Sequence, residues 1–220
     1  MSGGKTYFVS GIDTDAGKSY ATGWLAGVWR GEGRSVITQK LVQTGCPAGE
    51  VSEDIALHRR IMGLPLLSED LDHTTCSLRF EYPASPDLAS RLEGRAVDLA
   101  LADEATGKLL QKYDTVLIEG AGGLMVPLDG LFTTLDYVSD RGLPLILVTN
   151  PRLGSVNHTL LSLEACRGRG VEVAMALYNL YPETSPEITA DTRRIIAEYL
   201  ARHHPGCVFT DVPYINLAGG

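Results

Sequence analysis

Short apolar runs alternate along the chain with longer segments whose apolar residues recur at helical spacing. The apolar runs are typical of buried parallel strands, and they cover residues 7–9, 35–39, 115–118, 144–149, 171–179 and 208–212. Helical spacing predicts helices over residues 21–30, 53–62, 87–93, 99–112 and 186–203, and another that begins near Ser155. Residues 63–86 are predicted to be rich in loops. This alternation predicts an α/β fold with a doubly wound, mainly parallel sheet flanked by helices.

The first predicted strand leads into a loop over residues 11–19 that ends in Gly-Lys-Ser. A strand, a glycine-containing loop and a helix together direct backbone N–H groups and a helix N-terminus at a phosphate chain. Gly17 lets the backbone approach the phosphates, Lys18 can reach the β- and γ-phosphates, and the Ser19 hydroxyl can ligate Mg²⁺. The first glycine lies one residue earlier than in the usual spacing, so the sequence predicts a variant, P-loop NTPase-like nucleotide site.

Two more chemically useful residues follow predicted strands. Ligands of an open parallel sheet bind outside the carboxyl ends of its strands, so Lys40 and the loop over residues 43–45 should face the P-loop. Glu119 ends a buried strand and is followed by glycines, which is where P-loop proteins hold Mg²⁺ and bring backbone close to the γ-phosphate. The plainer alternatives are a solvated lysine and a strand-ending turn with an incidental glutamate.

The other candidates lie at helix starts or strand ends. Asp54 lies in the first turn of a predicted helix, where a carboxylate commonly complements the helix dipole. The helix that begins near Ser155 is expected to present free N–H groups of Ser155, Val156 and Asn157 to an anion such as a carboxylate, although many helix starts bind water alone. Asn179 ends a strand, where its amide could read a nucleobase.

Length, charge and cysteine usage narrow the class of protein. A chain of 220 residues can form one domain around a single core. Its net charge of −8 argues against nucleic acid or an anionic membrane as the partner, and favours a small substrate. No apolar run is long enough to span a membrane, and no secretory pattern begins the chain. The 4 cysteines are widely spaced, as in a reducing compartment, so a cytoplasmic protein is expected.

Several of these motifs, in this order, resemble the dethiobiotin synthetase family of ATP-dependent enzymes in biotin synthesis. The resemblance covers nearly the whole chain and is carried by residues 11–19, 40–45, 119–123 and 153–158 and by Asn179. The chain departs from the residues common in that family at three positions, where it has Leu41 for proline, Asp87 for histidine and Leu180 for aspartate.

The resemblance implies a reaction and places residues in it. CO₂ first carboxylates one amine of 7,8-diaminopelargonic acid, the carbamate then attacks the γ-phosphate of ATP, and the second amine closes the ring and expels phosphate. Thr14, Lys18 and Lys40 are implied beside the carbamate and the transferred phosphoryl group, where lysines offset negative charge. The implied Mg²⁺ ligands, a hard-oxygen set, are Ser19, Asp54 and Glu119.

The resemblance also implies the binding residues for both substrates. Those at the nucleotide are Asp15, Ala16, Gly17, Lys18, Ser19, Tyr20, Asp54, Glu119, Gly120, Ala121, Gly122, Asn179, Pro213, Tyr214 and Ile215. Thr44 would contact the diamine. Its carboxylate would be held by Ser155, Val156 and Asn157 from the other subunit of a homodimer.

A nucleotide-switched dimeric P-loop ATPase that docks a protein partner is the alternative. Such switches typically carry an extra lysine early in the P-loop, and residues 12–14 contain none. An amidating enzyme of the cobyrinate type would need a further glutamine-hydrolysing domain. An ATP-dependent cyclo-ligase of the dethiobiotin synthetase type is therefore the preferred interpretation.

Overall fold

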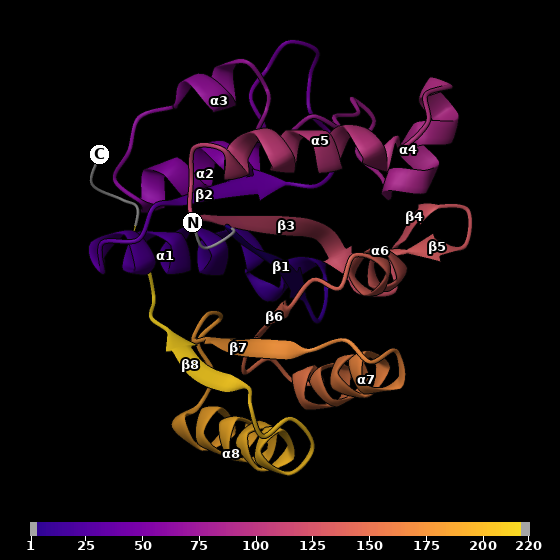
Figure 1. Ribbon diagram of the computed structural model, residues 1–220. Helices are drawn as coiled ribbons and strands as arrows, with labels where there is room; N and C mark the ends of the chain where they lie inside the picture. The colour runs from indigo at the N-terminus through magenta and orange to yellow at the C-terminus, as the bar shows by residue number, and fades with distance from the viewer. Residues whose placement is uncertain (1–3, 217–220) are drawn as a thin grey trace.

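A parallel sheet of six strands forms the centre of the computed structural model, which describes residues 4–216. The strand order is β2-β3-β1-β6-β7-β8, and Figure 1 shows it running downward from β2 to β8. Every neighbouring pair is parallel. The strands are β1 (Lys5–Gly11), β2 (Val36–Lys40), β3 (Thr115–Gly123), β6 (Leu145–Thr149), β7 (Val173–Asn179) and β8 (Val208–Val212). The predicted strands and the predicted parallel sheet are confirmed.

Helices cover both faces of this sheet. They are η1 (Thr14–Ala16), α1 (Lys18–Gly31), α2 (Glu53–Ile61), α3 (Ser68–Leu71), α4 (Pro86–Glu93), α5 (Leu99–Leu110), α6 (Thr134–Asp140), α7 (Ser155–Gly168) and α8 (Pro186–His203). Because successive strand residues point to opposite faces, β2 directs Thr38 at α2 and Gln39 at α5. Thr38 accepts a hydrogen bond from Arg59 of α2, and Gln39 donates one to a carbonyl of α5. This arrangement puts α2 over the face where β2 and β3 end.

A small hairpin and the helix after it were absent from the sequence prediction. Strands β4 (Pro127–Asp129) and β5 (Phe132–Thr133) pair antiparallel across a tight turn in which Gly130 has a φ of 55°. Thr133 then caps α6, and Asp136 completes a capping box with it. Strands of two or three residues are too short for alternation of apolar and polar positions to reveal them.

The interior consists mainly of strand side chains, because helices cover the sheet on both faces. Phe8 and Val9 of β1, Leu117 of β3 and Leu147 of β6 are completely buried. The central strands pack tightly enough that a Cβ on Gly120 would lie 2.8 Å from the Phe8 ring. Strand β3 continues to Gly123, beyond the predicted end at residue 118, so Glu119 lies within a buried strand.

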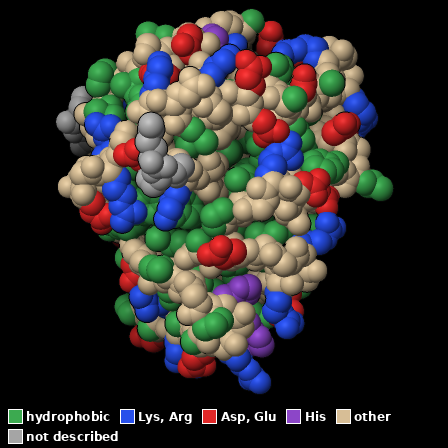
Figure 2. All heavy atoms as spheres, in the orientation of Figure 1, with side chains coloured by type: hydrophobic (Ala, Val, Ile, Leu, Met, Phe, Trp, Pro, Cys, Tyr) green, Lys and Arg blue, Asp and Glu red, His purple; other side chains and the backbone are tan. Residues whose placement is uncertain are grey.

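The surface carries mixed charge. On the face drawn in Figure 2, basic and acidic side chains are interspersed and no continuous basic area spans the view. Within residues 4–216, no helix is both long and apolar enough to cross a membrane. All four cysteines are free thiols, as their spacing predicts.

Candidate active site

The loop between β1 and α1 folds around the Lys18 side chain. Lys18 Nζ donates to the carbonyl oxygens of Asp13 and Thr14, each at 3.1 Å, and the side chain is buried. Burial lowers the pKa of this lysine. Gly17, just before the helix, has a φ of 85°, and a Cβ there would lie 2.1 Å from Asn179 Nδ2. The loop therefore requires glycine at this position.

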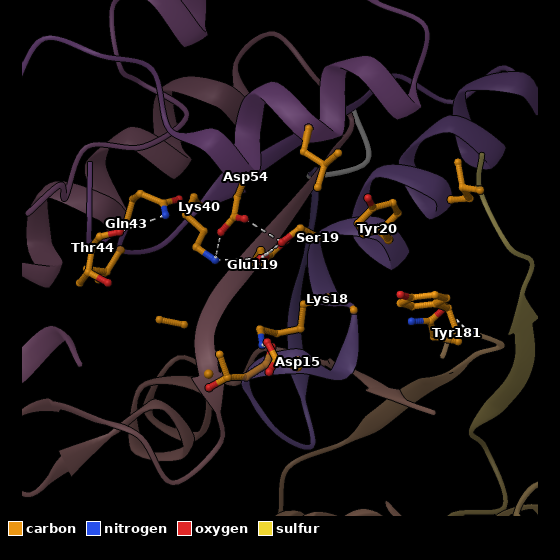
Figure 3. A pocket seen from close by; sticks show the side chains of 18 of the residues that line it. Asp15, Lys18, Ser19, Tyr20, Lys40, Gln43, Thr44, Asp54, Glu119 and Tyr181 are labelled. Carbon is orange, nitrogen blue, oxygen red and sulfur yellow. Dashed lines mark hydrogen bonds and ion pairs between the residues drawn. The ribbon is translucent and has the colours of Figure 1, made fainter. Parts of the chain in front are cut away.

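A cavity of about 700 Å³ opens at the carboxyl ends of the strands. Its lining residues are Thr14, Asp15, Gly17, Lys18, Ser19, Tyr20, Lys40, Val42, Gln43, Thr44, Asp54, Leu57, Glu119, Ala121, Gly122, Asn179, Tyr181, Pro213, Tyr214 and Ile215. In Figure 3, Gln43 and Thr44 lie at one end, Tyr20 and Tyr181 lie at the other, and the charged side chains lie between them. The cavity thus offers three zones along its length.

Most residues that the sequence and the resemblance assigned to the site line this cavity. Ala16 and Gly120 lie behind the lining, where the Ala16 carbonyl accepts from Asn179 Nδ2 and the Gly120 carbonyl accepts from Lys40 Nζ. Ser155, Val156 and Asn157 are not among the lining residues.

Lys40 is held between two carboxylates in the middle zone. Its Nζ lies 2.5 Å from Asp54 Oδ2 and 2.8 Å from Glu119 Oε1. Burial disfavours the charge on Lys40, but the carboxylates of Glu119 and Asp54 outweigh this effect and raise its pKa. Burial would likewise raise the pKa of Glu119, yet Lys40 and His58 hold it well below the usual value. Lys40 is therefore cationic and Glu119 anionic at neutral pH.

Ser19, at the start of α1, completes a set of oxygen atoms that fits Mg²⁺. Its Oγ lies 2.9 Å from Asp54 Oδ1 and 2.8 Å from Glu119 Oε1, so one hydroxyl and two carboxylates converge. Mg²⁺ prefers such hard oxygen ligands and is commonly held by one or two carboxylates together with phosphates and water. In the described part of the chain, no group of three or more His, Cys, Asp or Glu residues could hold a metal by itself. One hydroxyl and two carboxylates leave the other positions around the ion to phosphates and water, so the set fits an ion that arrives with a nucleotide.

His58 is a site residue that the sequence analysis missed. It is completely buried, with Nε2 2.8 Å from Glu119 Oε2 and Nδ1 3.0 Å from Thr38 Oγ1. His58 follows Asp54 by four positions on α2, so the two side chains share a helix face. That spacing was the available signal, but a lone histidine in a helix does not reveal which strand end the helix covers.

Tyrosines surround the opposite end of the cavity. The rings of Tyr181 and Tyr214 lie 6.0 Å apart between centroids, and both side chains are exposed. Between them and the P-loop, the Asn179 amide donates to the Ala16 carbonyl and accepts from the Tyr181 backbone N–H. Tyr181 was not identified from the sequence, because its role depends on β7 and β8 ending side by side.

The start of α7 corrects one expectation. Its N–H groups were expected to be free, but the Ser155 N–H donates to the Arg152 carbonyl at 2.9 Å. Gly154, with a φ of 91°, turns the chain so that this bond forms. Among the described residues, the N–H groups of Val156 and Asn157 have no backbone acceptor outside the helix. The expectation is therefore wrong for Ser155.

The structure places all three residues that depart from the family pattern. Leu41 is completely buried in the core. Asp87 of α4 accepts from the Gly130 N–H at 2.9 Å, and this bond joins α4 to the β4–β5 hairpin. Asp87 also pairs with Arg91 one turn later on α4. Leu180 packs against the core from a partly buried position. None of these side chains lines the cavity.

Comparison with known proteins gives a consistent picture. A family model described as an AAA domain matches residues 5–217. An ATP-dependent dethiobiotin synthetase of Pasteurella multocida is 46% identical over 97% of this chain and 99% of its own length. Enzymes of the same name from Haemophilus influenzae and Chlorobaculum tepidum are 53% and 49% identical, over 82% and 97% of this chain and 93% and 87% of their own lengths.

Among solved structures, the signal recognition particle receptor FtsY from Elizabethkingia anophelis is similar in fold. The TM-score is 0.54 at 14% sequence identity, and the match covers 99% of this chain and 61% of that one. At this identity the similarity concerns the fold alone, and it agrees with the arrangement of sheet and P-loop described above.

Proposed function

The chain belongs to the dethiobiotin synthetase family, and we propose that it catalyses the ATP-dependent carboxylation and ring closure of 7,8-diaminopelargonic acid in biotin synthesis. CO₂ and ATP are the co-substrates, and the products are dethiobiotin, ADP and phosphate. The observation that carries the proposal is the middle of the cavity, where buried Lys40 faces the P-loop between the Asp54 and Glu119 carboxylates. A cation fixed at that point can stabilise negative charge on a reacting carbamate.

Each of the three zones of the cavity suits one part of the substrates: the diamine, the phosphate chain or the nucleobase. Thr44 lines the end that would take the diamine, and Tyr181 and Tyr214 line the end that would take the nucleobase. Lys18 lies between them on the P-loop. When a phosphate chain enters, Lys18 Nζ can exchange its two carbonyl contacts for phosphate oxygens, which are stronger partners for an ammonium group.

Bond making and breaking then require little more than positioning. One amine of the substrate adds to CO₂, and an oxygen of the resulting carbamate attacks the γ-phosphorus while ADP leaves. The second amine then attacks the carbonyl carbon of the phosphorylated carbamate. Phosphate leaves and takes with it the carbamate oxygen that attacked the γ-phosphorus. Lys18, Lys40 and Thr14 line the part of the cavity where this charge develops.

Ser19, Asp54 and Glu119 would hold Mg²⁺ with the nucleotide phosphates. The ion supplies charge neutralisation at the β- and γ-phosphate oxygens. The protein supplies the orientation of the oxygen ligands, since Asp54 Oδ1 and Glu119 Oε1 already lie 2.9 Å and 2.8 Å from Ser19 Oγ.

A homodimer is part of the proposal. Val156 and Asn157 would present their N–H groups to the diamine carboxylate of the other subunit, and neither residue lines the cavity of its own chain. Met125 and Leu161, each 61% exposed, line a second pocket together with His158 of α7, and Leu153, just before α7, is 92% exposed. Exposed apolar side chains that gather in one region favour a protein interface.

The direct test is a mass-spectrometric assay for dethiobiotin with phosphate release followed in parallel. Protein is mixed with the diamine, bicarbonate and MgATP, and then with each component omitted in turn. Dethiobiotin should form in the complete mixture alone. Phosphate release that ignores the diamine, without ring product, would favour the nucleotide-switched ATPase.

A further inference from the structure

Glu119 is supported from behind by a continuous set of buried polar side chains. His58 contacts Glu119, Thr38 contacts His58, Arg59 contacts Thr38, and Asp70 contacts Arg59. All of these side chains are at least 99% buried. They come from β3, α2, β2 and α3, so four elements meet at this point. Buried polar groups of this kind are costly unless every member is satisfied.

The far end of the set is fully anchored. Arg59 binds Asp70 through two bonds, Nε to Oδ2 at 2.9 Å and Nη2 to Oδ1 at 2.8 Å. Asp70 also accepts from the Thr75 hydroxyl at 2.9 Å and from the Leu67 N–H at 2.8 Å. A two-point arginine–carboxylate pair fixes geometry more firmly than a single contact. Arg59 Nη1 is thereby aimed at Thr38 Oγ1, 2.8 Å away.

This anchor sets the direction of the bonds toward Glu119. Arginine always donates, so Thr38 Oγ1 accepts from Arg59 and its own proton is available to His58 Nδ1. With Nδ1 accepting, the neutral imidazole carries its proton on Nε2. That proton is donated to Glu119 Oε2. The reverse arrangement would set the bare lone pair of Nε2 against the carboxylate, which is repulsive.

We propose that His58 is a positioning residue that engages Glu119 Oε2, so that Oε1 alone is turned toward Ser19, Lys40 and an arriving cation. The proposal rests on the function of Glu119 given above. A carboxylate without this contact can rotate and present either oxygen, or both, to the cavity. Partners behind a ligand commonly orient it in this way and tune its affinity for metal.

Helix α2 is well suited to this task because it contributes to both sides of the site. Asp54 from its first turn enters the cavity, and His58 one turn later enters the core. Helix α1 fixes the position of α2, since a Cβ on Gly23 would lie 3.1 Å from the His58 Cα. The two carboxylates are therefore placed by one rigid element, and a change at His58 should be felt at Glu119.

The first test uses protein without nucleotide or metal. Nitrogen-edited NMR of ¹⁵N-histidine protein, with the His58→Leu variant to assign the signal among 5 histidines, reports which ring nitrogen carries the proton. The proposal expects the proton on Nε2 and a slowly exchanging N–H. A proton on Nδ1 with a bare Nε2, or a freely exchanging ring, would overturn it.

The second test measures the Mg²⁺ concentration that gives half the maximal rate. His58→Leu should raise it about tenfold or more, whereas the KM for ATP at saturating Mg²⁺ should change little. His58→Gln can still donate an N–H to Glu119 and should recover most of the loss. Gln39→Leu is the matched control, because it removes the hydrogen bonds of a buried side chain of β2 on the strand face opposite Thr38 and His58.

The outcomes separate this inference from the proposed function. If the wild-type protein makes dethiobiotin and His58→Leu keeps the normal Mg²⁺ requirement, the inference fails and the function stands. If the wild-type protein makes no dethiobiotin, the function fails, and the NMR result still decides whether His58 donates to Glu119. An equal rise in Mg²⁺ requirement for Gln39→Leu would reveal general loosening of the fold and would also count against the inference.

Discussion

Two buried lysines in one cavity illustrate how partners decide the properties of a residue. Lys18 contacts backbone carbonyls, and burial lowers its pKa, whereas Lys40 contacts two carboxylates that raise its pKa. The sequence could predict that both lysines lie at the nucleotide site, because Lys18 is part of the P-loop and Lys40 ends a neighbouring strand. It could not predict these different partners, since Asp54 and Glu119 join Lys40 from distant parts of the chain.

Replacing Lys40 separates binding from chemistry. Lys40→Met should lower kcat about 100-fold or more, because a fixed charge opposite the reacting carbamate is lost, while affinity for an ATP analogue measured by calorimetry should change far less. Lys108→Met removes an exposed lysine paired with Glu104 and serves as the control. Turnover close to normal in Lys40→Met would rule out the assigned role.

Glu119 provides the corresponding test for the metal site. Glu119→Gln removes one anionic ligand, so the Mg²⁺ concentration for half-maximal rate should rise by about tenfold or more. Titrating Mg²⁺ at fixed ATP measures this, and Glu104→Gln on the exposed face of α5 is the control. An unchanged Mg²⁺ requirement would contradict the ligand assignment.

At the scale of elements, long periodic segments could be predicted from the sequence and short ones could not. The six strands and the helix α8 follow from apolar runs and helical spacing, and they are confirmed. The β4–β5 hairpin and α3 are only two to four residues per element. Their form depends on packing against neighbours rather than on any repeating pattern. His58 was also missed because its role depends on packing: helical spacing does not reveal which strands the helix packs against.

The turn from β1 into α1 can be tested with a pair of glycines. Gly17 and Gly33 share a φ of 85°, but a Cβ on Gly17 would meet Asn179 Nδ2, and a Cβ on Gly33 would meet nothing within 4 Å. Both alanine variants should lose about 1–3 kcal/mol of stability through backbone strain. Gly17→Ala should in addition lose ATP affinity about tenfold or more, because Asn179 is displaced from the P-loop, whereas Gly33→Ala should bind normally. Calorimetric titration with ATP distinguishes them, and equal affinities would contradict this account of the loop.

At the scale of the whole molecule, sheet topology makes the site from distant segments. Parallel strands bring their carboxyl ends to one edge, so the P-loop, Lys40, Glu119 and Asn179 meet there although they are spread along the chain. This much could be predicted before the structure. The division of the cavity into a phosphate centre, a diamine end and a tyrosine-lined end required the structure, because it depends on where the loops after β2 and β8 lie. The homodimer stays a proposal at this scale.

The measurement that tests the central claim most directly is the fate of oxygen from CO₂. Protein, diamine and MgATP are mixed with fresh [¹⁸O]CO₂ and quenched before the label exchanges with water, and both products are analysed by mass spectrometry. If the carbamate attacks the γ-phosphate, each phosphate released should carry one ¹⁸O, and dethiobiotin should carry another in its ring carbonyl. Phosphate whose added oxygen comes from water would show simple ATP hydrolysis and would contradict the account.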